Sequence, residues 1–332
     1  MHFKKILAAT VCAVLALTMS ACGHDTDAQL EKVKVSEVTH SIFYAPMYAA
    51  INNGYFRQEG IEVELTNAGG SDKVMTSVIT GGADIGFAGP ESVIYVCARG
   101  KEDYPKVFAQ LTQCDGSFLV GRQPAEDFSW QDLKGSTILP GRKGGMPYMT
   151  LLYCLNRNGL EVGKDVIFDE SVSFDAMTGA FVAGTGDYVT VFEPGATRLE
   201  TEGKGYILAS VGEEGGQVPY TAYFANSDFI RENSDLIQRF ANAIYKGQQF
   251  VASSDRRRIA RAIAPSFGDT DVSVIEKVVQ RYKDIGAFSE DGVMRRENFD
   301  RLCLILENAG ELSADVDFED IVDNTYALRA KK

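Results

Sequence analysis

Residues 81–91 read GGADIGFAGPE and residues 184–194 read GTGDYVTVFEP, so one pattern occurs twice in the chain. Each copy starts with a glycine-rich turn that can end a helix and continues into a short apolar strand. Each closes with glutamate and proline, where a further helix would begin. Open α/β sheets bind ligands at the carboxyl ends of their strands. The repeated pattern therefore predicts two lobes whose strand ends face one cleft.

Short strands and helices alternate around the first copy, as is typical of an α/β protein. Residues 61–65 alternate apolar and charged side chains, which predicts a half-exposed strand. Residues 46–53 have proline in the first turn and are followed by Gly54, which predicts a short helix. Ser71 is predicted to cap the helix that follows. We expect an α/β fold in which each lobe is a mostly parallel sheet flanked by helices.

The length of the chain also indicates two lobes, because a single core rarely serves about 300 residues. We place lobe 1 in residues 33–111 and 219–330, and lobe 2 in residues 112–218. The first of two hinge crossings is expected at residues 110–115. Amphipathic helices, all expected to pack on lobe 1, are predicted at residues 235–251, 274–285 and 299–306.

The N-terminus has the pattern of a secretory signal peptide. Two lysines precede an uncharged run at residues 6–19, which is shorter than the ~20 residues of a spanning helix. The tetrad Met-Ser-Ala-Cys at residues 19–22 resembles a bacterial lipobox, in which the cysteine is acylated. We expect a signal peptide at residues 1–21, lipidation at Cys22 and a polar tether over residues 22–32. The protein would then be extracytoplasmic and lipid-anchored to the cell membrane.

The composition is acidic, with 33 basic and 46 acidic residues and a net charge of −13. Removing residues 1–21 leaves 31 basic and 46 acidic residues, a net charge of −15. Such a chain repels nucleic acid and anionic lipid, so nucleic acid is not an expected partner and membrane attachment would be covalent. Cys97, Cys154 and Cys303 lie in apolar helical patterns and are expected to be buried. The cysteine spacing predicts no metal site, and no cofactor is expected.

Catalytic motifs are missing from the sequence. It contains no G-x-S-x-G, G-x-x-x-x-G-K-[ST] or H-E-x-x-H pattern. His40 is the one histidine within the predicted lobes, and a lone histidine at a strand end is more often structural or a ligand contact than a general base. We therefore expect a binding protein and not an enzyme. A purely structural lipoprotein would not need two glutamate-ended strand edges that face each other.

Several short stretches carry a resemblance to a known family. They are HSIFYAP at 40–46, NGYF at 53–56, EGIEV at 59–63, GADIG at 82–86, DLKG at 132–135 and GRKGG at 141–145. Together they resemble bacterial solute-binding proteins that serve importers of nitrate, alkylsulfonates, taurine and thiamine pyrimidine precursors. The resemblance implies a type II periplasmic-binding fold that closes around its ligand, with an ABC permease and an ATPase as partners. Eukaryotic pyrimidine synthases resemble this fold too, so an enzyme of that kind is the alternative from another class.

Ligand contacts are predicted at the strand ends and the crossings. Phe43 and Tyr44 would stack on the ligand, with core packing as the alternative. Glu91 and Glu193 would accept hydrogen bonds from it, although either could instead cap its helix. The predicted ligand-binding set is His40, Ser41, Phe43, Tyr44, Gly70, Ser71, Gly89, Pro90, Glu91, Asp115, Arg142, Gly144, Gly145, Met146, Phe192, Glu193, Tyr220 and Tyr223.

The charges in this set favour one class of ligand. Residues 144–147 open a helix whose N-terminus could hold an anion or could simply be a turn. Two carboxylates, however, disfavour an anion in a desolvated site. We therefore predict a small amino-heterocyclic nutrient, similar to a thiamine pyrimidine precursor, with nitrate, an alkylsulfonate or taurine as alternatives. On this reading Glu193→Gln weakens binding and leaves thermal stability nearly unchanged.

Overall fold

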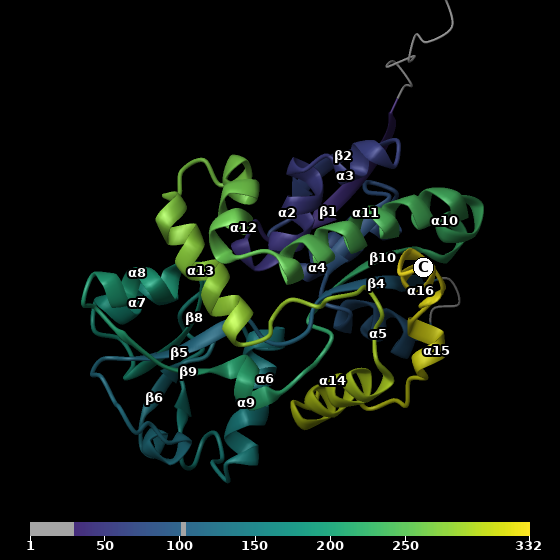
Figure 1. Ribbon diagram of the computed structural model, residues 1–332. Helices are drawn as coiled ribbons and strands as arrows, with labels where there is room; N and C mark the ends of the chain where they lie inside the picture. Colours follow the sequence, from purple (N-terminus) through teal and green to yellow (C-terminus); the bar gives the residue numbers. More distant parts are fainter. Residues whose placement is uncertain (1–29, 101–103) are drawn as a thin grey trace, which may run out of the picture.

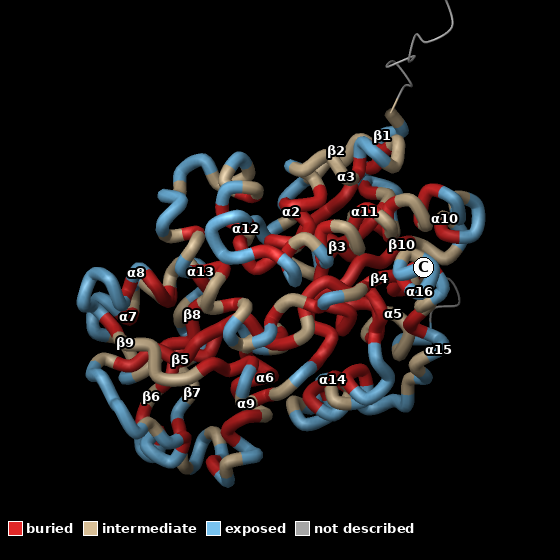
Figure 2. The backbone as a smooth tube through the Cα atoms, viewed as in Figure 1, coloured by how far each residue is buried: buried red, intermediate tan, exposed pale blue. Residues whose placement is uncertain are grey.

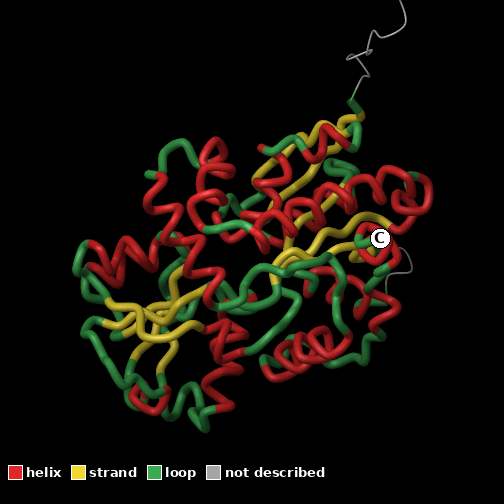
Figure 3. Tube along the Cα trace, viewed as in Figure 1, coloured by secondary structure: helices red, strands yellow, loops and turns green. Residues whose placement is uncertain are grey.

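The computed structural model describes residues 30–100 and 104–332 (Figure 1). The predicted signal peptide, Cys22 and most of the tether lie outside the described residues. The described chain forms two five-stranded sheets flanked by helices, and the strands gather in two separate groups (Figure 3). The predicted two-lobed α/β architecture is confirmed.

The sheet of lobe 1 has the strand order β2-β1-β3-β10-β4. Its strands are β1 (Glu31–Glu37), β2 (Ile61–Asn67), β3 (Ile85–Ala88), β4 (Pro105–Thr112) and β10 (Thr221–Asn226). β1 pairs in parallel with β2 and β3, whereas β10 is antiparallel to β3 and β4. Four strands run in one direction and β10 opposes them, so the sheet is mostly parallel.

The sheet of lobe 2 has the order β7-β6-β8-β5-β9 and repeats this arrangement. Its strands are β5 (Ser117–Gly121), β6 (Thr137–Leu139), β7 (Ile167–Phe168), β8 (Tyr188–Phe192) and β9 (Tyr206–Ser210). β6 is parallel to β7 and β8, and β5 is antiparallel to β8 and β9. In each sheet the antiparallel strand, β10 or β5, is therefore the first strand after the chain crosses from the other lobe.

The two copies of the repeated pattern occupy equivalent places. Before β3, the Asp84 Oδ2 atom accepts a hydrogen bond from Lys34 N at 2.8 Å. Before β8, the Asp187 Oδ2 atom accepts one from Thr137 N, also at 2.8 Å. Each aspartate fastens the start of its strand to the neighbouring strand, β1 or β6. The structure thus shows why aspartate stands at this point in both copies.

Helices of different lengths surround the two sheets. Those next to the first sheet are α2 (Ala45–Asn52), α3 (Tyr55–Gln58), α4 (Ser71–Ile79), α5 (Glu91–Ala98), α10 (Ser227–Glu232), α11 (Ser234–Ser253), α12 (Arg256–Ile263), α13 (Val272–Asp284), α15 (Phe318–Ile321) and α16 (Thr325–Ala330). Those of lobe 2 are α6 (Met146–Arg157), α7 (Met177–Val182), α8 (Gly195–Thr201) and α9 (Val211–Gly215). No helix among the described residues is both long enough and apolar enough to cross a membrane.

The longest helix, α11, shows how the core of lobe 1 is built. Leu236, Phe240 and Ile244 lie on one face of α11 and are buried, because residues three or four apart share a helix face. This face packs on α2. A Cβ atom at Gly247 would lie 2.2 Å from the Pro46 carbonyl oxygen, so glycine is needed where the two helices meet. Figure 2 shows that buried residues follow the strands and the inner faces of such helices.

The prediction that the C-terminal helices all pack on lobe 1 holds only in part for α14 (Arg296–Asn308). The Phe299 ring of α14 lies 5.3 Å from the Phe318 ring of α15 in lobe 1. The helix also packs on α6 of lobe 2, and its Asn308 Oδ1 atom accepts a hydrogen bond from Asn156 Nδ2 at 2.8 Å. The segment before α14 runs beside the first crossing, where Gln113 N donates to Ala287 O at 2.9 Å. An amphipathic pattern shows which face of a helix is buried, but not which lobe covers it.

The cysteine predictions hold in part. Cys154 is buried, as expected, whereas Cys97 and Cys303 are only half-buried. Cys114, which was not assigned to the core, is buried beside the first crossing. Burial raises the pKa of the Cys303 thiol to about 11, so this thiol stays protonated near neutral pH.

Candidate functional site

Glu91 is a buried carboxyl group at the carboxyl end of β3. Pro90 is the N-cap of α5, and Glu91 is the first residue of that helix. The Glu91 Oε2 atom has no hydrogen-bond partner among the described residues. Burial raises the pKa of Glu91 to about 7, against smaller effects of its own backbone N–H, the Ser71 hydroxyl and the Arg142 charge. The buried, unpartnered oxygen can accept a hydrogen bond from a ligand.

Two further unpartnered groups come from the crossings. Asp115 lies in the first crossing, and its Oδ1 atom accepts hydrogen bonds from Ser117 N at 2.7 Å and Ser117 Oγ at 2.5 Å. Its Oδ2 atom has no partner in the described structure. Tyr220 precedes β10, and its buried hydroxyl also lacks a partner there. Burial raises the pKa of Asp115, and Ser117, Tyr220 and Thr150 oppose this rise.

These groups are close enough to influence one another electrostatically. Burial raises the pKa of Tyr220 well above its ordinary value, and the charge of Asp115 is the next cause, with Glu91 contributing as well. Burial also raises the pKa of Tyr44, followed by the charges of Glu37 and Glu91. The polar groups at the junction of the lobes thus come from four segments: the end of β3, the turn after β1 and the two crossings. The structure unites Tyr44, Glu91, Asp115 and Tyr220 from the predicted set.

Phe43 forms the aromatic wall of this place and connects the lobes. The centroid of its ring lies 4.9 Å from that of Tyr282, 5.7 Å from Tyr220 and 6.1 Å from Phe192 of lobe 2. A Cβ atom at Gly116 would lie 2.7 Å from the Phe43 ring, so the first crossing runs close against it. Phe43 is 1% exposed and Phe192 is partly exposed. The predicted aromatic contacts Phe43, Phe192 and Tyr220 therefore lie together.

The lobes also touch beside this cluster. The Tyr95 hydroxyl of α5 donates to Met149 Sδ of α6 at 3.7 Å. The Arg142 guanidinium of lobe 2 lies 3.9 Å from Asp72 Oδ1 of lobe 1. Chemically, the place between the lobes offers two carboxyl groups, tyrosine hydroxyls and ring faces. Such a set suits a small, flat molecule with N–H donors.

Glu193 has a different role from the one predicted. It is buried at the end of β8, where its Oε2 atom accepts from Thr197 N at 2.8 Å and its Oε1 atom accepts from Thr197 Oγ1 at 2.9 Å. It also pairs with the Arg281 guanidinium. Both carboxylate oxygens are occupied, so the prediction that Glu193 is a free acceptor is corrected. The helix-capping alternative describes what the structure shows.

The position of each glutamate relative to proline explains this difference. Pro90 and Pro194 are the N-caps of α5 and α8. Glu91 follows its proline and becomes the first helical residue, whereas Glu193 precedes its proline and reaches back to the first turn of α8. The repeat in sequence suggested two equivalent glutamates, but the one-residue offset separates their functions.

His40 lies in a network of its own. Its Nδ1 atom is 2.8 Å from the Tyr48 hydroxyl and 3.1 Å from Glu37 Oε1. Its Nε2 atom is 2.8 Å from the carbonyl oxygen of Ser266, to which it donates. Both ring nitrogens are therefore used in joining the turn after β1 to the end of α12. The predicted ligand contact at His40 is corrected to a structural role.

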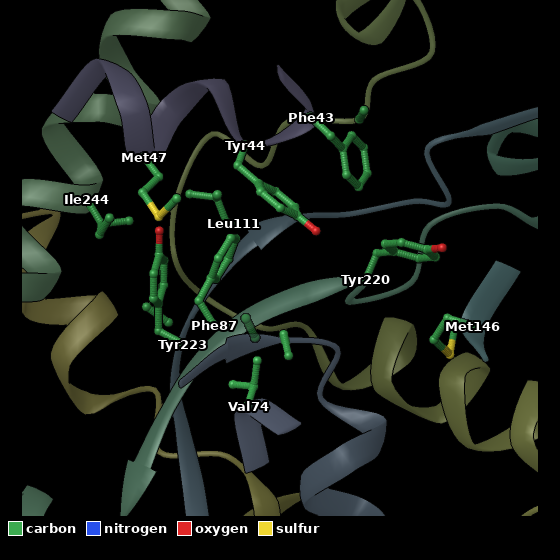
Figure 4. Packing of buried hydrophobic residues seen from close by; sticks show 14 of the residues in the cluster. Phe43, Tyr44, Met47, Val74, Phe87, Leu111, Met146, Tyr220, Tyr223 and Ile244 are labelled. Atoms are coloured by element: carbon green, nitrogen blue, oxygen red, sulfur yellow. The ribbon is translucent and has the colours of Figure 1, made fainter. Parts of the chain in front are cut away.

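Tyr223 and Ser41 are also removed from the candidate site. The Tyr223 ring stacks on Phe87 at 4.5 Å inside lobe 1, and Figure 4 shows its hydroxyl directed toward Met47. Alternation along β10 explains this, because Tyr223 is three residues after Tyr220 and faces the opposite side of the sheet. Ser41 accepts a hydrogen bond from Phe43 N at 3.2 Å and so caps the turn that carries Phe43.

The lobe 2 loop before α6 borders the site. Gly145 is the N-cap of α6, and Met146 is its buried first residue. Gly144 has a φ of 74°, a conformation that favours glycine. Arg142 is exposed and faces Asp72, as described above.

Gly70, Ser71 and Gly89 of the predicted set have different roles in lobe 1. Gly70, and not Ser71 as predicted, is the N-cap of α4. The Ser71 hydroxyl instead acts on Glu91 and lowers its pKa. A Cβ atom at Gly89 would lie 1.9 Å from Glu91 Oε2, so any larger residue there would displace the Glu91 carboxyl group.

Sequence reasoning missed Tyr282 and Arg281 on α13. Tyr282 is fully buried against Phe43, and its hydroxyl accepts a hydrogen bond from Glu193 N at 3.2 Å. Their hydrogen-bond and ion-pair partners in lobe 2 lie 80 to 90 residues earlier in the chain, and α13 shows only an ordinary amphipathic pattern. The one available signal was the position of Arg281, a charged residue next to the apolar face of α13.

Comparison with known proteins agrees with this architecture. The model of the "NMT1/THI5 like" family matches residues 42–256. "Putative binding protein YtlA" of Bacillus subtilis (strain 168) is 42% identical over 313 residues, 94% of this chain and 93% of that protein. The chain therefore belongs to the NMT1/THI5-like family.

Solved structures show the same fold at low identity. The alkanesulfonate-binding protein SsuA from Xanthomonas axonopodis pv. citri, bound to MOPS, has a TM-score of 0.67 at 15% identity and covers 90% of this chain and 97% of its own. The periplasmic nitrate-binding protein NrtA from Synechocystis PCC 6803 has a TM-score of 0.67 at 14% identity, covering 91% and 88%. These likenesses establish the periplasmic-binding-protein fold.

Proposed function

We propose that the protein is the extracytoplasmic solute-binding component of an ABC importer and that it holds its solute between the lobes. Membership of the NMT1/THI5-like family and the likeness of fold to nitrate- and alkanesulfonate-binding proteins support this role. The lobes that would close are residues 33–111 with 219–330 and residues 112–218, and α14 contacts both. A ligand stabilises such a closed state through contacts with both lobes at once. A permease and an ATPase would be the partners.

One observation carries the choice of site: three buried polar atoms at the junction of the lobes lack partners within the described residues. They are Glu91 Oε2, Asp115 Oδ2 and the Tyr220 hydroxyl oxygen. An unsatisfied buried polar group costs about 1–3 kcal/mol. A solute that supplies donors to the two carboxyl groups would remove this cost.

The same atoms favour an amino-heterocyclic solute, similar to a thiamine pyrimidine precursor. Carboxyl oxygens accept hydrogen bonds from amino and protonated ring nitrogens, and the partly exposed Phe192 ring beside Phe43 can pack on a heterocycle. Nitrate, taurine or an alkylsulfonate would bring a negative charge next to Glu91 and Asp115. Repulsion of like charges in a desolvated site disfavours these alternatives.

A panel of solutes tests this choice. We expect an aminopyrimidine to raise the melting temperature of the purified protein, and nitrate, taurine and an alkylsulfonate to leave it unchanged. At a hundred times its dissociation constant, a cognate solute adds about 2.7 kcal/mol of stability. Mass spectrometry of small molecules released from natively purified protein would then identify the solute. A melting shift with sulfonate or nitrate alone would contradict the proposed ligand class.

We further propose that Cys22 carries the lipid that attaches the protein to the membrane. The net charge of −15 after removal of residues 1–21 supports a covalent anchor, because an acidic chain is not drawn to anionic lipid. We expect Cys22→Ser to move the protein from the membrane fraction of cells to the soluble fraction. Membrane retention of the variant equal to that of the wild type would argue against the anchor.

A further inference from the structure

Arg281, near the end of α13, makes its side-chain contacts with lobe 2. Its guanidinium pairs with Glu193, donates to Thr197 Oγ1 at 2.9 Å and pairs with Glu200 Oε2 at 3.0 Å. It also lies over the Phe118 ring of β5, 5.7 Å from the centroid. These four partners come from β5, from α8 and from the residue that caps α8. All of them belong to lobe 2.

The helix that carries Arg281 is nevertheless part of lobe 1. α13 packs mainly on α12, and Figure 1 shows it between α12 and α8. Two residues after Arg281, the Lys283 ammonium group donates to Val251 O at 3.1 Å and to Ser254 O at 2.7 Å, both at the end of α11. The end of α13 is thus fastened to lobe 1 by Lys283 and to lobe 2 by Arg281.

The ion pairs of Arg281 must therefore change when the lobes separate. Glu193 is buried at the base of α8, and the Arg281 side chain is 27% exposed, so this pair is partly shielded from solvent screening. None of the unpartnered atoms of the solute site belongs to Arg281 or to its partners. The contact can stabilise closure without touching a bound solute.

We propose that Arg281 is a latch between the lobes: a positioning residue that holds the protein closed through Glu193 and Glu200 and so sets solute affinity indirectly. This inference rests on the proposed function only for its effect on solute binding. The latch itself is a property of the protein without solute. Because a shift of the open–closed equilibrium acts on apparent affinity, losing the latch should speed solute release.

Arg239 of α11 provides a matched control. Its side chain is also 27% exposed and also pairs with two carboxylates, Glu31 and Asp235. All three residues lie in lobe 1, so this ion-pair set does not join the lobes. Arg239→Gln removes the same kind of charge and the same number of pairs as Arg281→Gln, but not a contact between lobes.

The experiment compares the radius of gyration of the two variants and the wild type by small-angle X-ray scattering, without solute. We expect Arg281→Gln to be expanded, Arg239→Gln to match the wild type, and Arg281→Lys to recover part of the compaction. With the solute found by the panel above, we expect release from Arg281→Gln to be faster by on the order of tenfold, the size of one charge-assisted hydrogen bond. Equal radii for all proteins, or equal expansion of both glutamine variants, would overturn the latch.

A second variant tests the latch in case Arg281→Gln does not fold. Glu200 is exposed, and Glu200→Gln removes one arm of the latch while leaving the Glu193 contacts in place. We expect a smaller expansion from Glu200→Gln, and an unchanged radius would also count against the latch. Because scattering needs no solute, expansion of Arg281→Gln with no response in the solute panel would support the latch while rejecting the proposed solute class.

Discussion

Glu91→Gln should weaken solute binding by about 10- to 100-fold, because a hydrogen bond to a charged group contributes about 1.5–3 kcal/mol. Glutamine keeps the shape and one acceptor oxygen but cannot carry the negative charge that an amino or protonated nitrogen favours. Isothermal titration calorimetry with the solute identified above measures the change. Glu161→Gln, on the exposed surface of lobe 2, is the control and should bind like the wild type.

The pH dependence gives this prediction a second readout. Burial raises the pKa of Glu91 to about 7, so the free protein partly holds a proton there near neutral pH. A cationic solute requires the ionised form, so wild-type affinity should fall as the pH drops below about 7, and binding should release protons. Glu91→Gln should lack this step. A wild-type affinity that is flat between pH 6 and pH 8 would be evidence against contact of a cationic solute with Glu91.

The same raised pKa predicts an opposite effect on stability. A carboxyl group whose folded pKa exceeds its unfolded value stabilises the protein below the unfolded pKa of about 4.5, and this contribution is lost as pH rises through about 7. At pH 8 the ligand-free wild type must keep a buried charge that Glu91→Gln does not have. The variant should therefore bind more weakly and melt no lower than the wild type.

Glu193→Gln should lower the free energy of unfolding by about 2–3 kcal/mol, contrary to the effect expected from the sequence. Removing one partner of a buried ion pair leaves the other charge uncompensated, at a cost of about 3–5 kcal/mol when burial is complete. Arg281 keeps Glu200 and some contact with solvent, which reduces the loss. Denaturant unfolding and the melting temperature measure it, and several degrees of lower melting temperature are expected.

The comparison of the two glutamates separates structure from recognition. Glu193→Gln should shift stability strongly and Glu91→Gln should shift affinity strongly. If Glu193→Gln melts with the wild type yet binds poorly, Glu193 is a direct ligand contact and our assignment of its oxygens to Thr197 and Arg281 is incorrect.

The sequence predicted the architecture because that information is local. The pattern of turn, aspartate and apolar strand occurs around both Asp84 and Asp187. Each aspartate accepts a hydrogen bond from a backbone N–H of a neighbouring strand. Strand-end positions also nominated Phe43, Glu91 and the crossings as ligand contacts, and that assignment stays a prediction.

The remaining site assignments depended on tertiary contacts. Nothing near His40 in sequence shows that Ser266 will occupy its ring nitrogen, and nothing near Glu193 shows that Arg281 will pair with it. Tyr223 failed for a local reason, because its position along β10 relative to Tyr220 places it on the other side of the sheet. Alternation within one strand should have separated these two tyrosines.

The place of β10 between β3 and β4 in the first sheet affects the order of assembly during synthesis. This strand lies between β3 and β4 but is made about a hundred residues after them, so β4 cannot join the other strands until residues 221–226 have emerged. The five strands of the second sheet, from Ser117 to Ser210, are continuous in the chain. The second sheet can therefore pair all its strands first, because the first sheet stays incomplete until β10 has been made.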